Sequence, residues 1–344
     1  MWCRFKSRRA RRVYLLVCFL SQMFLSGSTV QAQEQSKEIP SAPTASDRPQ
    51  QIVPPLSPEA EDPLLLRAHR AAEEGSFASG EAAVREFLTQ HPASTDAHYL
   101  LGYILYREVH AKESLSEYTL AAQQRKPTAM ELEIVALDYV LLGDFTDADR
   151  WLTKSLSWNP ANALGWYYLG RAKYNENRFA EAIDAFNTYL KLEPRSVKAE
   201  DNIGLSEEGL NHPEEAAKAF QIAISWQEGS SEKNAQPFLN LGSLLAHQGH
   251  ADAGLPYLLK ATELSPRNAK GHEQLGRAYV KLKQLKNAQT ELEKAIQLAP
   301  NSSSLHFELG MTYRDQGLKE QAKQEFDRCA TLNATHSSVD TPNQ

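Results

Sequence analysis

The chain has little cysteine and lacks the common catalytic and nucleotide-binding signatures. Of its 344 residues only three are cysteine, Cys3, Cys18 and Cys329. No stretch reads GxxxxGK[ST], GxSxG, HExxH or CxxC, which excludes the usual motifs of phosphate loops, nucleophile elbows, zinc proteases and thiol redox sites. We therefore predict no catalytic residue, no metal site and no cofactor, and we expect that the protein is not an enzyme.

The first 32 residues have the three parts of a secretory signal. A basic stretch without acids precedes the apolar run 13–25, and Val30-Gln31-Ala32 forms a small-x-small cleavage site. The apolar run is shorter than the roughly 20 residues of a membrane span. We predict that residues 1–32 are a signal peptide cleaved after Ala32, which leaves no membrane span; an uncleaved anchor in the inner membrane is the alternative.

Removal of this segment makes the protein more acidic. The whole chain has a formal net charge of −6, and the first 32 residues hold six basic residues, so the remainder carries −12. An acidic protein has no general attraction for nucleic acid, so we predict no nucleic-acid partner. Only Cys329 remains, and an internal disulfide is excluded. Residues 33–60 are rich in Pro, Ser and Gln, and 335–344 are polar, so both are predicted to be disordered, as a linker and a tail.

A repeat of 34 residues occupies the rest of the chain. It begins with a small residue that recurs eight times, at Ala68, Gly102, Ala136, Gly170, Gly204, Gly242, Gly276 and Gly310. A second small residue follows each after twelve positions, at Gly80, Ser114, Ala148, Ala182, Ala216, Gly254, Ala288 and Ala322, and a large apolar residue four positions later, as at Phe186. Two antiparallel helices approach most closely where both carry small side chains. Each unit is therefore predicted to be a helical hairpin, and stacked hairpins form an α-solenoid.

The pattern resembles the tetratricopeptide repeat (TPR) family. One unit carries Trp166, Leu169, Gly170, Ala182, Phe186 and Pro194, with Lys173 where the family has Tyr. The resemblance implies an all-α, right-handed solenoid of about eight units. They lie near 61–94, 95–128, 129–162, 163–196, 197–234, 235–268, 269–302 and 303–334, in a domain spanning 61–334.

Local features of individual units lead to further predictions. Gly75, Gly143, Gly249 and Gly317 fit left-handed turns between the paired helices. Four extra residues within 227–236 should lengthen one connection. Pro256 falls inside an expected helix, which it should kink or start late.

In this family the first helix of each unit lines a concave groove. Exposed positions on these helices are predicted to bind a partner, and they are Tyr99, Tyr103, Tyr106, Tyr167, Arg171, Tyr174, Lys198, Asn202, Asn240, Lys270, Arg277, Phe307 and Arg314. Tyr and Arg dominate binding hot spots, although each tyrosine could equally pack between units. His98, His272 and His306 stand where the family often has Trp, so a packing role is favoured over metal ligation.

The resemblance implies a non-enzymatic scaffold that binds a protein or peptide in its groove. An exported scaffold of this kind suggests a periplasmic role in assembly or maintenance of a bacterial cell envelope. A self-associating structural array and an accessory subunit of an envelope enzyme complex are the alternatives. The sequence leaves the oligomeric state open.

Overall fold

The computed structural model describes residues 53–57, 61–231 and 233–339, and in this part the chain forms sixteen helices and no strands. The predicted signal 1–32, most of the predicted linker and residues 340–344 lie outside it. The helices form eight consecutive pairs, and in each pair the even-numbered helix comes first and the odd-numbered helix second. The first helices are α2 (Pro63–Glu73), α4 (Thr95–Arg107), α6 (Ala129–Leu142), α8 (Ala163–Asn175), α10 (Val197–Gly209), α12 (Gln236–His247), α14 (Ala269–Lys281) and α16 (Ser303–Asp315).

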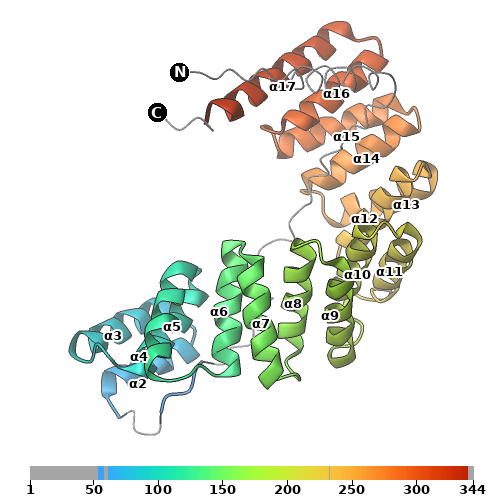
Figure 1. Cartoon of the computed structure of the whole chain (residues 1–344). Helices are drawn as coiled ribbons and strands as arrows, with labels where there is room; N and C mark the ends of the chain where they lie inside the picture. Colours follow the sequence, from blue (N-terminus) through green and yellow to red (C-terminus); the bar gives the residue numbers. More distant parts are fainter. Residues whose placement is uncertain (1–52, 58–60, 232, 340–344) are drawn as a thin grey trace, which may run out of the picture. The chain divides into compact units, whose positions relative to one another are not determined.

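The second helices are α3 (Phe77–Gln90), α5 (Ala111–Gln124), α7 (Phe145–Trp158), α9 (Phe179–Leu192), α11 (Pro213–Ser225), α13 (Ala251–Leu264), α15 (Leu285–Leu298) and α17 (Lys319–Val339). Each helix packs mainly against the helices before and after it, and the first helices of neighbouring units also touch one another from α2 to α14 (Figure 1). The prediction of an all-α helical-hairpin repeat is confirmed.

In the six pairs whose first helix carries a glycine as the small residue, a large side chain of the second helix covers it. The Phe186 ring lies so close to Gly170 that a Cβ atom there would meet it at 2.7 Å, and Gly310 has the same relation to Phe326. Ala182 and Phe186 are fully buried. The paired small residues are thus the point of closest helix approach, as the sequence predicts.

Helix boundaries follow from local chemistry. The side chains of Ser94, Thr128, Asn162, Ser196 and Asn268 each accept a hydrogen bond from a backbone N–H three residues later, in the first turn of a first helix. A proline stands two residues after the ends of α3, α7, α9, α13 and α15. At the equivalent place in the last unit stands Ala334, and α17 continues to Val339. The predicted disordered tail is therefore wrong for 335–339, because no proline stops the helix there.

The turns inside the hairpins are left-handed, as predicted. Gly75, Gly143, Gly249 and Gly317 have φ values of 75°, 75°, 92° and 81°. In the other four units the same place is taken by residues with a side chain, which are Val109, Asn177, Asn211 and Lys283, with φ between 60° and 68°. Glycine adopts this conformation without strain and asparagine tolerates it, whereas β-branched Val109 does so at a cost.

Three expectations about irregular segments have different outcomes. The connection between α11 and α12 runs from Trp226 to Ala235, so the extra residues do lengthen it. Helix α13 begins at Ala251 with Pro256 inside it, so the late start is wrong. Residues Val53–Ser57 of the predicted linker pack on the helices, with Val53 only 8% exposed. The disorder expected from composition is therefore wrong for this short segment, because it contains apolar residues that find a buried site.

Candidate partner-binding face

The first helices of successive units are joined by polar side chains, which defines one face of the repeat. Asn240 Nδ2 on α12 donates to Asp201 Oδ1 on α10 at 2.9 Å. Arg277 Nε on α14 donates to Glu308 Oε1 on α16 at 2.8 Å. Lys281 Nζ donates to the carbonyl oxygen of Ala246 at 2.5 Å. We call this surface, formed by α2, α4, α6, α8, α10, α12, α14 and α16, the first-helix face.

In the N-terminal units the predicted binding tyrosines are buried. Tyr99, Tyr103 and Tyr106 are 1%, 3% and 2% exposed. The Tyr99 hydroxyl donates to the Arg125 carbonyl at 2.8 Å, and the Arg125 guanidinium lies 4.1 Å from the centre of the Tyr99 ring. Burial raises the pKa of Tyr99 to about 12. The expectation that these side chains are exposed is wrong, because large aromatic groups here fill the space between neighbouring helices.

The fourth unit shows the same behaviour. The Tyr167 ring centre lies 5.4 to 5.8 Å from those of Tyr168, Phe186 and Tyr189, in edge-on and tilted contacts, and the side chain is nearly buried. Arg171 and Asn202 are also buried, while Tyr174 is partly exposed and packs on Phe179. The structure therefore places Tyr167, Arg171 and Asn202 in packing positions, against their predicted exposure. It does bring Tyr167 and Asn202 together, at 3.5 Å between Oη and Nδ2.

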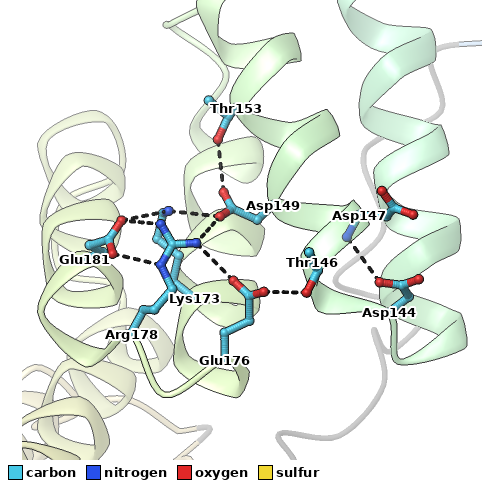
Figure 2. Close-up of polar contacts among 9 residues, drawn as sticks. All are labelled: Asp144, Thr146, Asp147, Asp149, Thr153, Lys173, Glu176, Arg178 and Glu181. Carbon is cyan, nitrogen blue, oxygen red and sulfur yellow. Dashed lines mark hydrogen bonds and ion pairs between the residues drawn. The ribbon is translucent and has the colours of Figure 1, made fainter.

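Lys173, which replaces the Tyr of the family pattern, belongs to a charged network rather than to the aromatic packing. Its Nζ atom lies 3.1 Å from both Asp149 Oδ2 on α7 and Glu181 Oε2 on α9 (Figure 2). Arg178 bonds the same two carboxylates and Glu176. Hydrogen bonds from Arg178 and Lys173 lower the pKa of Glu181 to about 2. The network ties three helices together across the junction of two units.

The C-terminal units carry basic side chains that solvent can reach. Lys198 and Arg314 are exposed, Phe307 is 49% exposed, and Lys270 and Arg277 are partly exposed. These five predicted residues thus remain accessible on α10, α14 and α16.

Several acidic groups of the same helices are buried or paired, while Glu208 on α10 is partly exposed. Glu273 bonds Lys270 and Arg277, and Glu308 bonds Arg277. Asp201 is buried against Asn240, and burial raises the pKa of Asp201 to about 7. The same ion pairs occupy Lys270 and Arg277, and Arg314 is paired with Asp315.

Sequence reasoning missed the cation Lys281 on α14 and, one repeat before it, His247 on α12, whose pKa is lowered by partial burial and by the neighbouring cations. Both are exposed. Among the described residues Lys281 has no carboxylate within ion-pair distance, and burial together with Arg277 lowers the pKa of Lys281. Their positions differ by 34, one repeat, and Lys281 follows Arg277 by four residues on the same helix face. That spacing is the signal that could have found them.

The three histidines that replace Trp form a repeated hydrogen-bonded clasp. In His98, His272 and His306, Nδ1 lies 2.6 to 2.7 Å from a glutamate of the second helix in the same unit. Nε2 lies 2.9 to 3.1 Å from the carbonyl oxygen of the proline six residues earlier. Trp166 donates to the Pro160 carbonyl from the same position. The packing role is confirmed, and both ring nitrogens are engaged.

A carbonyl oxygen only accepts, so Nε2 is the donor in the contact with the proline carbonyl. Within the described residues no group of three or more His, Cys, Asp or Glu is placed to hold a metal ion.

Comparisons with known proteins agree with this architecture of helical hairpins that carry an interaction surface. Sequence profiles of the tetratricopeptide repeat match residues 65–129, 163–196, 235–268, 269–302 and 303–336, together more than half of the chain. The chain belongs to the tetratricopeptide repeat family. Its repeats therefore support a protein-interaction scaffold, a type of protein that is typically not an enzyme.

Curated relatives share only a short stretch with this chain. The peroxisomal targeting signal receptor of Kluyveromyces lactis is 36% identical over 74 residues, which is 22% of this chain and 13% of the receptor. That of Saccharomyces cerevisiae is 31% identical over 102 residues, 30% of this chain and 16% of the receptor. The chain thus matches less than a fifth of the length of these relatives.

Solved structures show the same fold at low identity. A tetratricopeptide repeat protein from Parabacteroides merdae has a TM-score of 0.57 and 20% identity, covering 72% of this chain and 97% of that one. The APC/C hetero-tetramer Cut9-Hcn1 gives a TM-score of 0.55 and 18% identity, covering 79% and 53%. In the part of the chain that the structure describes, no helix is both long and apolar enough to cross a membrane.

Proposed function

We propose that the protein is a non-enzymatic scaffold that binds an acidic, extended protein segment on the first-helix face of its last four units. The observation that carries this proposal is the row of accessible cations at Lys198, Lys270, Arg277, Lys281 and Arg314. Lys281 has no carboxylate within ion-pair distance among the described residues, whereas Lys270, Arg277 and Arg314 are paired with acids of their own or the next first helix. Complementary charge steers association and selects a partner.

The surroundings of the cations suit a peptide. Phe307 offers an exposed ring beside Phe326, at 5.8 Å between ring centres, and can take an apolar side chain of the partner. The name of the yeast relatives says that those proteins are receptors for a targeting signal, which is in keeping with recognition of a protein segment by such repeats. Binding of such a segment requires no catalytic residue.

A binding titration tests the proposal. A fluorescein-labelled ten-residue peptide of alternating Glu and Ser should bind the full chain, and added salt should weaken the binding. The double variant Lys270→Gln/Lys281→Gln should bind about tenfold more weakly, because each exposed ion pair contributes up to about 1 kcal/mol. Lys286→Gln is the matched control, since Lys286 is an exposed lysine on the second helix α15.

Three results would contradict the proposal. The first is equal affinity of the wild type and the double variant for the acidic peptide. The second is equal binding of a peptide in which Gln replaces Glu, and the third is no binding of the acidic peptide at low salt.

We also propose that the scaffold is exported and acts in a bacterial cell envelope, in the periplasm. The support is the order of basic, apolar and small residues in 1–32 and the acidic remainder of the chain. N-terminal sequencing of the protein recovered from its own cells should find Gln33 as the first residue. A chain that starts at Met1 and sediments with membranes would favour the anchored alternative, and one that starts at Met1 in the cytoplasmic fraction would contradict export.

A further inference from the structure

A short segment of the chain lies on the first-helix face at its N-terminal end. The backbone N–H of Ser57 donates to Asp96 Oδ2 at 2.9 Å, and His69 Nε2 donates to the carbonyl oxygen of Pro54 at 3.1 Å. Val53 belongs to the same buried cluster as Leu65, and Leu56 packs against that cluster. We call residues Val53–Ser57 the strap.

The repeat shows where on the face the strap lies. Asp96 precedes Lys198 by 102 residues, three repeats, so the two residues occupy the same position of a first helix. His69 likewise precedes Arg171 by three repeats. The strap thus contacts, at Asp96, a position that stays exposed in a later unit as Lys198, whereas the position of His69 is buried there as Arg171.

We propose that the strap is an intramolecular ligand of the face formed by α2 and α4, and that it must leave before a partner segment of the same chemistry can bind there. That partner is an extended, proline-containing segment. It offers a carbonyl to His69, an N–H three residues later to Asp96, and apolar side chains at the places of Val53 and Leu56. This site is separate from the cationic site on α10–α16.

The strap is held by few contacts, so it can be displaced. Two hydrogen bonds and the burial of Val53 and Pro54 must offset the ordering of five residues. Pro54 and Pro55 reduce this ordering cost because proline restricts the free chain. An attached ligand of this kind competes at an effective concentration on the order of millimolar.

Release of the strap should therefore expose the site. In the full chain, Val53→Asp places a charge in the apolar cluster and should free the strap. A fluorescein-labelled peptide of the sequence IVPPLSP should then bind Val53→Asp at least tenfold more tightly than it binds the wild type, measured up to millimolar concentrations. Pro55→Ala is the matched control in the strap: Pro55 is exposed, and loss of its restraint on the free chain should raise the peptide affinity by no more than about fivefold.

A second pair of measurements identifies the site. Adding His69→Ala to Val53→Asp should reduce peptide binding about tenfold while the helical circular dichroism stays unchanged. In the wild type the Ser57 amide should exchange slowly with deuterium, and in Asp96→Ala it should exchange at the rate of a free amide.

Several outcomes would overturn the inference. They are equal peptide affinity in wild type and Val53→Asp, no binding by Val53→Asp at millimolar peptide, no effect of His69→Ala, or fast exchange of Ser57 in the wild type. The acidic peptide used for the cationic site should bind Val53→Asp and wild type alike. The experiments can therefore contradict the proposal for the cationic site and the proposal for the strap independently of each other.

Discussion

The two halves of the repeat array use the same helix positions for opposite purposes. In α4 these positions hold Tyr99, Tyr103 and Tyr106, which are buried, and the strap lies on the same helix. In α14 Arg277 takes the place of Tyr103 and Lys270 that of Asp96, and both remain partly exposed. One backbone pattern thus supports a closed, aromatic surface at one end and an open, cationic surface at the other. Membership of the family fixes the scaffold, and the side chains at a few positions decide what each unit does.

The largest expected difference concerns matched phenylalanines in the two halves. Phe186 is fully buried over Gly170, so Phe186→Ala should lower the free energy of unfolding by about 3 to 5 kcal/mol. Phe326 occupies the same position in the last unit but is partly exposed. Phe326→Ala should therefore cost about half as much or less. Urea titration followed by circular dichroism measures both, and equal losses would contradict the contrast between the halves.

Buried acids should make the N-terminal half sensitive to pH. Asp138 on α6 is fully buried, and burial raises its pKa from 3.8 to about 8. A protonated Asp138 can donate to Ser114 Oγ at 2.5 Å, while Ser114 donates to the Gly102 carbonyl at 2.9 Å.

The direction of this effect follows from proton binding. Between pH 4 and pH 8 the folded chain holds this proton and the unfolded chain does not, so stability falls as pH rises. Between pH 5 and pH 7 the free energy of unfolding should decrease by about 2 to 3 kcal/mol less in Asp138→Asn than in the wild type. Chemical denaturation at several pH values measures the change in this decrease. The control is Asp184→Asn, because Asp184 is an exposed residue of α9. A pH profile identical to that of the wild type would disprove the assignment.

The smallest expected effect lies in the turns. Val109 is 50% exposed with φ of 68°, a conformation unfavourable for a β-branched residue. Val109→Gly should relieve the strain at some entropic cost and stabilise the protein by about 0.5 to 1 kcal/mol. Gly143→Ala, at the same place in the next unit, should destabilise it by a similar amount. Thermal unfolding measures the two changes, and a shift of the same sign in both would refute the explanation.

Periodicity predicts the fold well because it reports backbone packing directly. The small residues at Gly170 and Ala182 can only recur in phase if two helices meet there, and the structure confirms this contact. The end of α17 could also be anticipated, since no proline stands at Ala334. The burial of Val53 could not, because a single apolar residue in a proline-rich stretch has no period.

The candidate site was predictable only in part. Helix position alone does not tell whether a tyrosine faces solvent or a neighbouring helix, and Tyr99 is held by Arg125, which lies 26 residues away. Charged residues are costly to bury, so Lys198, Lys270 and Arg314 remain accessible as expected. Arg171 is the exception, since it is buried beside Tyr168.

The clasps that join proline carbonyls to ring donors are unevenly distributed along the array. They close the junctions before α4, α8, α14 and α16 through His98, Trp166, His272 and His306. At the junctions before α6 and α12 the same place holds Leu132 and Phe238, which have no polar hydrogen to give, and before α10 it holds Glu200. Under a pulling force the junctions before α6, α10 and α12 would then separate before those that carry a clasp, and the last of these junctions contains the long connection 226–235.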